Sequence, residues 1–121
     1  MLIFGAFLFA SCSTVAERAD GKLIGKWRST DQRGHTAEYE FLANGTFRGS
    51  VVDYDGSLLS KFAGRWVFRD RVISYEYTSD KTGRIRAGTK DRDKLLRIGP
   101  DHFVIEAADG SVRKYVRVSN G

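Results

Sequence analysis

The chain has 121 residues, of which 41% are hydrophobic, and this length fits a single domain with one core. Twenty Lys and Arg against fifteen Asp and Glu give a formal net charge of +5. Basic and acidic residues alternate, as in the segment 90–94 (KDRDK), and form no block of one sign. This pattern favours a solvated mixed-charge surface over a nucleic-acid interface. The single cysteine excludes both a disulfide within the chain and a zinc site built from several cysteines.

The chain begins with about ten almost wholly apolar residues, Met1 to Ala10. This run is too short to span a bilayer, which needs ~20 residues, and it predicts a targeting segment. The alternative is a buried N-terminal strand with Cys12 as a small core thiol. The small and polar character of residues 11–20 is more typical of a tether and favours the targeting segment.

The tetrapeptide Phe9-Ala10-Ser11-Cys12 resembles the lipobox of bacterial lipoproteins, in which an apolar and two small residues precede a cysteine. The resemblance implies that Cys12 receives diacylglycerol and becomes an N-terminus that carries acyl chains such as palmitate. It divides the chain into a signal segment 1–11, a lipidated tether 12–21 and a folded domain 22–118. Two or more acyl chains give a stable membrane anchor. Ser13, where an Asp would retain a lipoprotein in the inner membrane, implies outer-membrane sorting with the domain facing the periplasm.

The folded part shows period-two alternation of apolar and polar residues in short runs, which is typical of half-buried strands. Asn44-Gly45 is the strongest hairpin signal, because both residues tolerate the positive φ of a type I′ turn. Trp27 and Trp66 each follow a glycine by two residues and are expected to anchor the core. The expected strands are 21–30, 35–42, 46–53, 61–69, 72–78, 94–98, 102–107 and 111–118.

The segment 79–92 is the one long polar stretch without a sustained period. Loops of this length are uncommon unless they are functional or disordered. Two interpretations remain open: a mobile flap over one end of a barrel, and a loose surface loop interrupted by a short strand at 84–87.

Eight short strands in a meander predict an all-β fold, an up-and-down antiparallel barrel or a closed sandwich. The chain resembles small bacterial lipocalin-like lipoproteins over residues 22–118. The similarity rests on the motifs Gly25-x-Trp27, Asn44-Gly45-Thr46-Phe47, Gly64-x-Trp66, Asp93-x-Leu95 and Tyr115-x-Arg117. Because such families share a fold and no common activity, the resemblance implies an architecture and not a reaction.

No set of residues in the sequence has the pattern of a catalytic or metal site. The two histidines, His35 and His102, are isolated and lie at expected strand starts. Asp53 and Asp55 precede a glycine, but the acidic positions of an EF-hand loop are missing, which favours a plain turn. Four glutamates alternate with apolar residues and are expected on the outer surface: Glu38, Glu40, Glu76 and Glu106. We therefore expect neither an enzyme nor a metal or other cofactor.

Ten large rings are expected to point inward, namely Tyr39, Phe41, Phe47, Phe62, Trp66, Phe68, Tyr75, Tyr77, Phe103 and Tyr115. An eight-stranded barrel either fills with side chains or holds one small ligand, and so many rings favour a packed core. If a ligand enters, the residues expected to line its site are Tyr39, Phe47, Trp66, Phe68, Tyr75 and Tyr77.

Two functions from different classes follow. The first is an envelope lipoprotein whose domain binds a small apolar ligand or an envelope partner. The second is a periplasm-facing inhibitor or chaperone-like interaction protein with a solid core, acting through strand edges and loops such as 79–92.

The first and last strands of an up-and-down barrel are neighbours, so Trp27 and Arg117 are expected to meet across the closing seam. The lipocalins that the chain resembles pair a first-strand Gly-x-Trp with such an arginine. A guanidinium over the indole would close that end of the barrel and contribute about 0.5–2 kcal/mol. The alternative places the face of Val112, Val116 and Val118 inward and leaves Arg117 in solvent.

Overall fold

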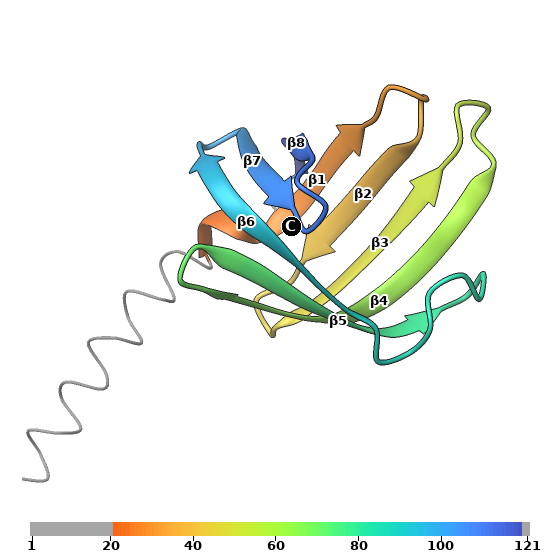
Figure 1. Ribbon diagram of the computed structural model, residues 1–121, viewed down its shortest axis with the longest axis horizontal. Helices are drawn as coiled ribbons and strands as arrows, with labels where there is room; N and C mark the ends of the chain where they lie inside the picture. Colours follow the sequence, from red (N-terminus) through yellow and green to blue (C-terminus); the bar gives the residue numbers. More distant parts are fainter. Residues whose placement is uncertain (1–20, 120–121) are drawn as a thin grey trace, which may run out of the picture.

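The computed structural model describes residues 21–119, and these form one closed antiparallel barrel (Figure 1). The expected signal segment, Cys12 and nearly all of the expected tether lie outside the described residues. The strands are β1 (Gly25–Thr30), β2 (Thr36–Phe41), β3 (Thr46–Val52), β4 (Leu58–Arg69), β5 (Val72–Asp80), β6 (Lys90–Ile98), β7 (His102–Ala107) and β8 (Val112–Ser119). Within residues 21–119, no helix is long and apolar enough to cross a membrane.

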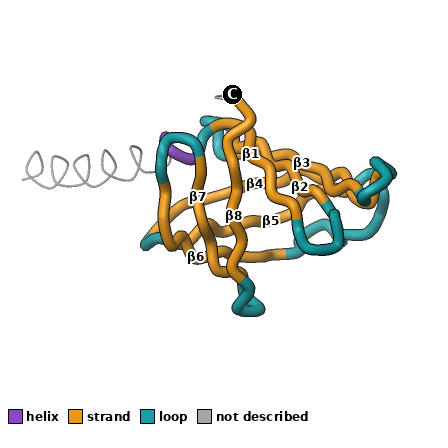
Figure 2. The backbone as a smooth tube through the Cα atoms, turned by 90° about the horizontal axis from the view of Figure 1, so that it is seen from above, coloured by secondary structure: helices purple, strands orange, loops and turns teal. Residues whose placement is uncertain are grey.

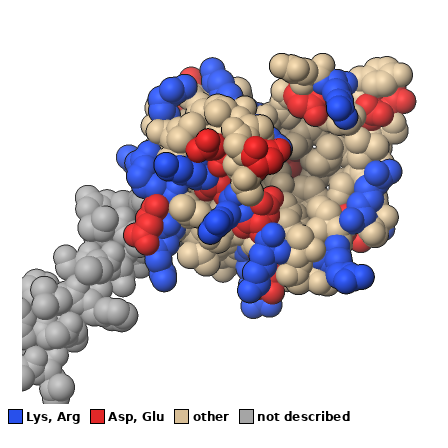
Figure 3. Space-filling model, in the orientation of Figure 1, with Lys and Arg blue, Asp and Glu red and all other residues tan. Residues whose placement is uncertain are grey.

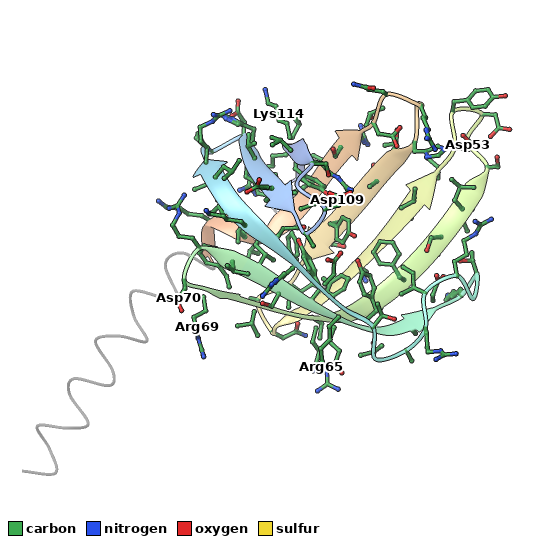
Figure 4. All side chains as sticks on the ribbon, in the orientation of Figure 1. Asp53, Arg65, Arg69, Asp70, Asp109 and Lys114 are labelled. Carbon is green, nitrogen blue, oxygen red and sulfur yellow. The ribbon has the colours of Figure 1, made fainter. Side chains whose placement is uncertain are left out.

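Each strand pairs with its neighbour in the sequence, and β8 returns to pair with β1 (Figure 2). The predicted eight-stranded up-and-down barrel is therefore confirmed. The β2–β3, β4–β5 and β6–β7 turns share one end of the barrel with a helical turn at Gly21–Leu23, and we call this the closed end. The other four connections form the open end. Figure 4 shows Asp70 at the closed end and Asp53, on the β3–β4 hairpin, at the opposite end.

Four predicted strand boundaries differ from the structure by two or more residues. Residues 21–23 form a helical turn rather than the start of a strand, and β4 begins three residues early, at Leu58. The expected loop 79–92 shrinks to 81–89 because β5 runs on to Asp80 and β6 starts at Lys90. No strand forms at 84–87.

The β5–β6 connection, residues 81–89, is the longest between strands of the barrel and is held by backbone and side-chain hydrogen bonds. The N–H of Tyr77 donates to the carbonyl of Thr89 (2.8 Å), and the N–H of Gly88 donates to the carbonyl of Tyr77 (2.7 Å). The Asp80 carboxylate accepts from the N–H groups of Thr82 and Ile85, both at 2.9 Å. Partial burial by itself would raise the pKa of Asp80. The hydrogen bonds from these N–H groups and from the Thr82 hydroxyl outweigh it and hold the pKa well below its usual value. The connection is therefore a loop tied to the end of β5 by hydrogen bonds.

The barrel interior is filled by aromatic rings that pack over glycines. Phe47 lies opposite Gly64 across the β3–β4 pair, and Gly49 lies opposite Phe62 in the same pair. A Cβ at Gly64 would come within 2.7 Å of the Phe47 ring, and one at Gly49 would come equally close to Phe62. Each ring therefore uses the space that a missing side chain leaves on the facing strand.

Candidate binding site

A cleft of about 660 Å³ opens between β1 and β8 at the open end of the barrel. We call it the seam cleft. In Figure 3 the surface is indented between the lobe that carries β7 and β8 and the β1–β2 hairpin. The cleft is lined by Ser29, Thr30, Asp31, Gln32, Arg33, His35, Ala37, Val51, Asp109, Ser111, Val112, Arg113, Lys114 and Tyr115.

The seam cleft exists because β1 and β8 pair over only part of their length. Their register covers three pairs, Lys26 with Ser119, Trp27 with Arg117 and Arg28 with Val116, and it shifts between Lys26 and Trp27. From Arg28 and Val116 towards the open end of the barrel, the two strands are no longer paired. The other seven strand pairs carry five to eight registered positions each, so the β1–β8 seam has the shortest registered pairing of the barrel.

The acidic residues of the seam cleft are already engaged in turns. Asp31 accepts the N–H groups of Arg33 and His35, each at 2.9 Å. Partial burial works against them, but these two bonds keep the pKa of Asp31 below its ordinary value. Asp109 accepts the hydroxyl (2.7 Å) and the N–H (3.0 Å) of Ser111, which lower its pKa in the same way.

Among the basic residues of the seam cleft, Arg113 lies against the hydroxyl of Tyr115. Arg33, Arg113 and Lys114 form no ion pair within residues 21–119. The two turn-bound carboxylates, Asp31 and Asp109, keep their negative charge, but the three basic side chains outnumber them in the lining. The cleft therefore favours an anionic group.

In the interior beneath the cleft, the tyrosine hydroxyls form hydrogen bonds with one another and with a buried carboxyl group. Tyr75 donates to Asp93 (2.9 Å), and the hydroxyls of Tyr39 and Tyr77 lie 3.0 Å apart. Asp93 is only 9% exposed, and this burial raises its pKa. Burial, helped by the Asp93 charge, raises the pKa of Tyr115 to about 12. The buried tyrosine hydroxyls and the Asp93 carboxyl thus form a hydrogen-bonded polar cluster in the core.

The residues expected to line a ligand site lie in this filled interior. Rings of this set pack against one another and against further rings, with centroids 5.0 to 6.2 Å apart. Trp66 also donates its indole N–H to the carbonyl of Leu42 (3.1 Å). None of the six residues lines the seam cleft: Tyr39, Phe47, Trp66, Phe68, Tyr75 and Tyr77.

One feature of the sequence indicates the cleft, although the large number of inward aromatic rings favoured a completely filled interior. On the inward faces of β2 and β3, the residues towards the open end are small: Ala37 on β2 and Val51 on β3. Small inward side chains at one end of a barrel leave space there, whereas large ones fill the other end.

At the closed end, Arg117 covers the indole of Trp27. Its guanidinium carbon lies 4.1 Å from the ring centroid, and its nitrogens donate to the carbonyls of Pro100 (2.7 Å), Ile24 (3.0 Å) and Lys22 (3.0 Å). Trp27 is fully buried and donates its own N–H to the carbonyl of Leu23 (2.8 Å).

The opposite face of β8 is the outer one. Val112, Val116 and Val118 are 62%, 49% and 43% exposed, whereas Tyr115 is buried. The alternative in which these valines form the core is therefore wrong.

The two histidines lie beside carboxylates. His35 lies 3.4 Å from both Asp31 and Asp53, and His102 lies 2.9 Å from Asp101. No cluster of three or more potential metal ligands occurs in the described part of the chain. Glu38 and Glu40 pair with Arg28 and Arg48 on the outer face of the barrel.

No protein-family model matches the chain, and no curated protein matches it in sequence. Its fold is nevertheless similar to solved structures. The crystal structure of a lipocalin-like protein from Bacteroides uniformis matches with a TM-score of 0.57 and 20% identity, over 79% of this chain and 98% of that one. A protein from Bacteroides uniformis solved by NMR matches with a TM-score of 0.58 and 17% identity, over 82% and 91% of the two chains. The predicted small bacterial lipocalin-like domain is confirmed at the level of fold.

Proposed function

We propose that this protein is a binding module that takes an amphiphilic ligand in the seam cleft. The observation that supports this function is a cleft of about 660 Å³ above an interior already filled with rings. A volume of this size suits a small ligand or a short segment of a larger one.

The lining indicates how such a ligand would lie. Ala37, Val51 and Tyr115 offer an apolar floor, while Arg33 and Lys114 offer positive charge. Because charged side chains stand beside this apolar floor, a ligand with both an apolar part and an anionic group fits better than the purely apolar molecule expected from the sequence.

The test uses the fluorescent amphiphile 8-anilinonaphthalene-1-sulfonate as the probe. Ala37→Phe would fill the floor of the seam cleft and should weaken probe binding at least about tenfold. Ala63→Phe, on the outer face of β4, is the matched control and should leave binding unchanged. Equal binding by the parent chain and Ala37→Phe, both folded by circular dichroism, would reject the seam cleft as the site.

We also propose that the module is an envelope lipoprotein, held in the outer membrane by acyl chains on Cys12 and facing the periplasm. The lipobox-like run 9–12 and the small, polar segment after it support this proposal. Metabolic labelling with an alkynyl palmitate analogue should tag the full chain and not Cys12→Ala. Label retained on Cys12→Ala would contradict the anchor.

The filled interior also favours the second function expected from the sequence, an interaction protein with a solid core. Thirteen buried side chains form one continuous cluster inside the barrel. A protein segment bound in the seam cleft would serve this function without an internal cavity.

A further inference from the structure

The hydrogen-bond pattern of β8 shows which of its backbone groups face the seam cleft. The N–H of Arg117 donates to the carbonyl of Asp101, and the N–H of Ala107 donates to the carbonyl of Ser111, both at 2.8 Å. Antiparallel strands alternate between hydrogen-bonded and non-hydrogen-bonded pairs. In the β7–β8 register, Arg113 and Tyr115 therefore bond to β7. The backbone groups of residues 112, 114 and 116 point the other way, towards β1.

Only one of these three residues pairs with a residue of β1. Val116 pairs with Arg28, but the register records no partner on β1 for Val112 or Lys114. Both residues line the seam cleft. Their N–H and C=O groups thus form an open strand edge along one wall of the cleft.

The β1 wall has the same character. The N–H of Asp31 donates to the carbonyl of His35 (2.9 Å), which sets the alternation in the β1–β2 register. By this alternation Ser29 bonds to β2, and the backbone groups of Thr30 face the cleft. The seam cleft is therefore a gap between β1 and β8 in which the facing backbone groups of the two strands are not paired with each other.

We propose that the ligand of the seam cleft is a short extended peptide segment that adds to β8 as an antiparallel strand. This inference rests on the proposed function and names its ligand class. Exposed strand edges are templates for another chain, and strand addition uses main-chain hydrogen bonds for affinity and side-chain pockets for specificity.

The two faces of the bound strand meet different surroundings. Residues directly opposite in an antiparallel pair share a face, so peptide residues bonded to Val112 and Lys114 point outward with them. Lys114 projects from the barrel surface (Figure 4) and favours an acidic side chain there. The alternate peptide residues point inward onto Val51 and Tyr115 and favour apolar side chains. The expected segment therefore alternates acidic and apolar residues.

The probe that follows is a fluorescently labelled peptide, acetyl-(Glu-Val)₃-amide. We expect it to bind the full chain, with anisotropy as the readout. N-methylation of its glutamates removes the N–H groups that face β8 and should weaken binding at least about tenfold. N-methylation of its valines removes N–H groups that face β1, where Thr30 presents backbone groups to the cleft, and should weaken binding less than N-methylation of the glutamates does. Equal binding of the unmodified and Glu-methylated peptides would overturn strand addition.

Two variants at position 114 separate the backbone from the charge. Lys114→Pro removes the N–H that faces the cleft and leaves the bonds to β7 intact, since those belong to residues 113 and 115. It should weaken peptide binding at least about fivefold. Lys114→Gln keeps the N–H and removes the charge, and it should weaken binding about twofold. If Lys114→Pro is folded and binds as tightly as Lys114→Gln, the proposed edge is wrong.

The probe 8-anilinonaphthalene-1-sulfonate separates this inference from the proposed function. If Ala37→Phe abolishes binding of the dye while the peptide does not bind the parent chain, the cleft is a small-molecule site and strand addition fails alone. If neither probe depends on Ala37, both proposals fail. A β8-to-β8 dimer in sedimentation velocity that Lys114→Pro abolishes, without peptide binding, would also overturn the peptide ligand.

Discussion

Arg117 is the residue on which the closed end depends. Its guanidinium donates hydrogen bonds to three backbone carbonyls and covers the Trp27 ring. Hydrogen bonds to a charged group and a cation–π contact contribute about 0.5–3 kcal/mol each, with partial overlap. We expect Arg117→Ala to lower the free energy of unfolding in urea by about 2–4 kcal/mol.

The control for this prediction is Arg69→Ala, at an exposed position at the end of β4 (Figure 4). Its effect should be within about 0.5 kcal/mol, as is usual for surface substitutions. If Arg117→Ala costs no more than Arg69→Ala, the arginine does not hold the closed end together.

Asp93 gives the core a dependence on pH. Burial raises its pKa above the ordinary value of 3.8 in the folded chain. Its contribution to stability is therefore fully present below pH 3.8 and is lost as pH rises through the folded pKa. Asp93→Asn keeps an acceptor for the Tyr75 hydroxyl and carries no charge. We expect Asp93→Asn to be more stable than the parent chain at pH 7, by about 1 kcal/mol in the free energy of unfolding.

Urea unfolding at pH 7 and at pH 3.5 checks this expectation. The advantage of Asp93→Asn should shrink towards zero at the lower pH. Asp70→Asn, at an exposed position in the β4–β5 turn, should show no such trend. An advantage that is equal at both pH values would mean that the ionisation of Asp93 is not its cause.

At the scale of the elements, the contact between β4 and its two neighbours depends on Gly64. A Cβ there would strike the carbonyl of Glu76 and the ring of Phe47, at the point where the β4–β5 register shifts. Overpacking of this kind typically costs about 1–3 kcal/mol. We expect Gly64→Ala to lose about 3 kcal/mol in thermal or urea unfolding. Gly21→Ala, whose Cβ would meet no atom within 4 Å, should be neutral; a neutral Gly64→Ala would show that β5 can shift away.

The strand pattern could be predicted wherever one face of a strand is buried. Ile73, Tyr75 and Tyr77 alternate with polar residues, and they are all buried. The prediction failed at residues 90–92, where β6 is exposed on both faces and has no apolar side to reveal its period. It also missed the helical turn at 21–23, because three residues are too few to show a helical period.

The seam cleft could not be predicted for a different reason. It results from the point at which β1 and β8 stop pairing, after Arg28 and Val116. Those two residues are 88 positions apart, and no local pattern records how far a closing pair extends. The contact between Trp27 and Arg117 was predictable because strand order alone brings the two ends of an up-and-down barrel together.

At the scale of the whole molecule, the barrel combines a solid interior with one incomplete seam. The pairing along β2 to β5 is long, and the largest rings pack across it. The seam between β1 and β8 is short and contains a register shift. A ligand that completes the seam would therefore add strand pairing where the registered pairing is shortest, without entering the packed core.

Amide hydrogen exchange followed by NMR gives a direct view of this seam. An N–H bonded within the sheet exchanges only when the structure opens, whereas an unbonded N–H at the surface is weakly protected. We expect Lys114 to exchange at least about a hundredfold faster than its neighbours Arg113 and Tyr115, whose N–H groups bond to β7. Thr30 should likewise exchange faster than Ser29. These pairs are adjacent in sequence, so each serves as the other's control for local environment.

The same measurement with the acidic peptide present tests the occupied state. Strand addition should slow exchange at Lys114 and Val112 and leave Tyr115 unchanged, because only the even-numbered residues face the cleft. Protection that rises equally at odd and even positions would indicate general stabilisation instead of a new strand. If Lys114 is already as protected as Arg113 in the free protein, its N–H has a partner, and the β8 edge is not open to a ligand.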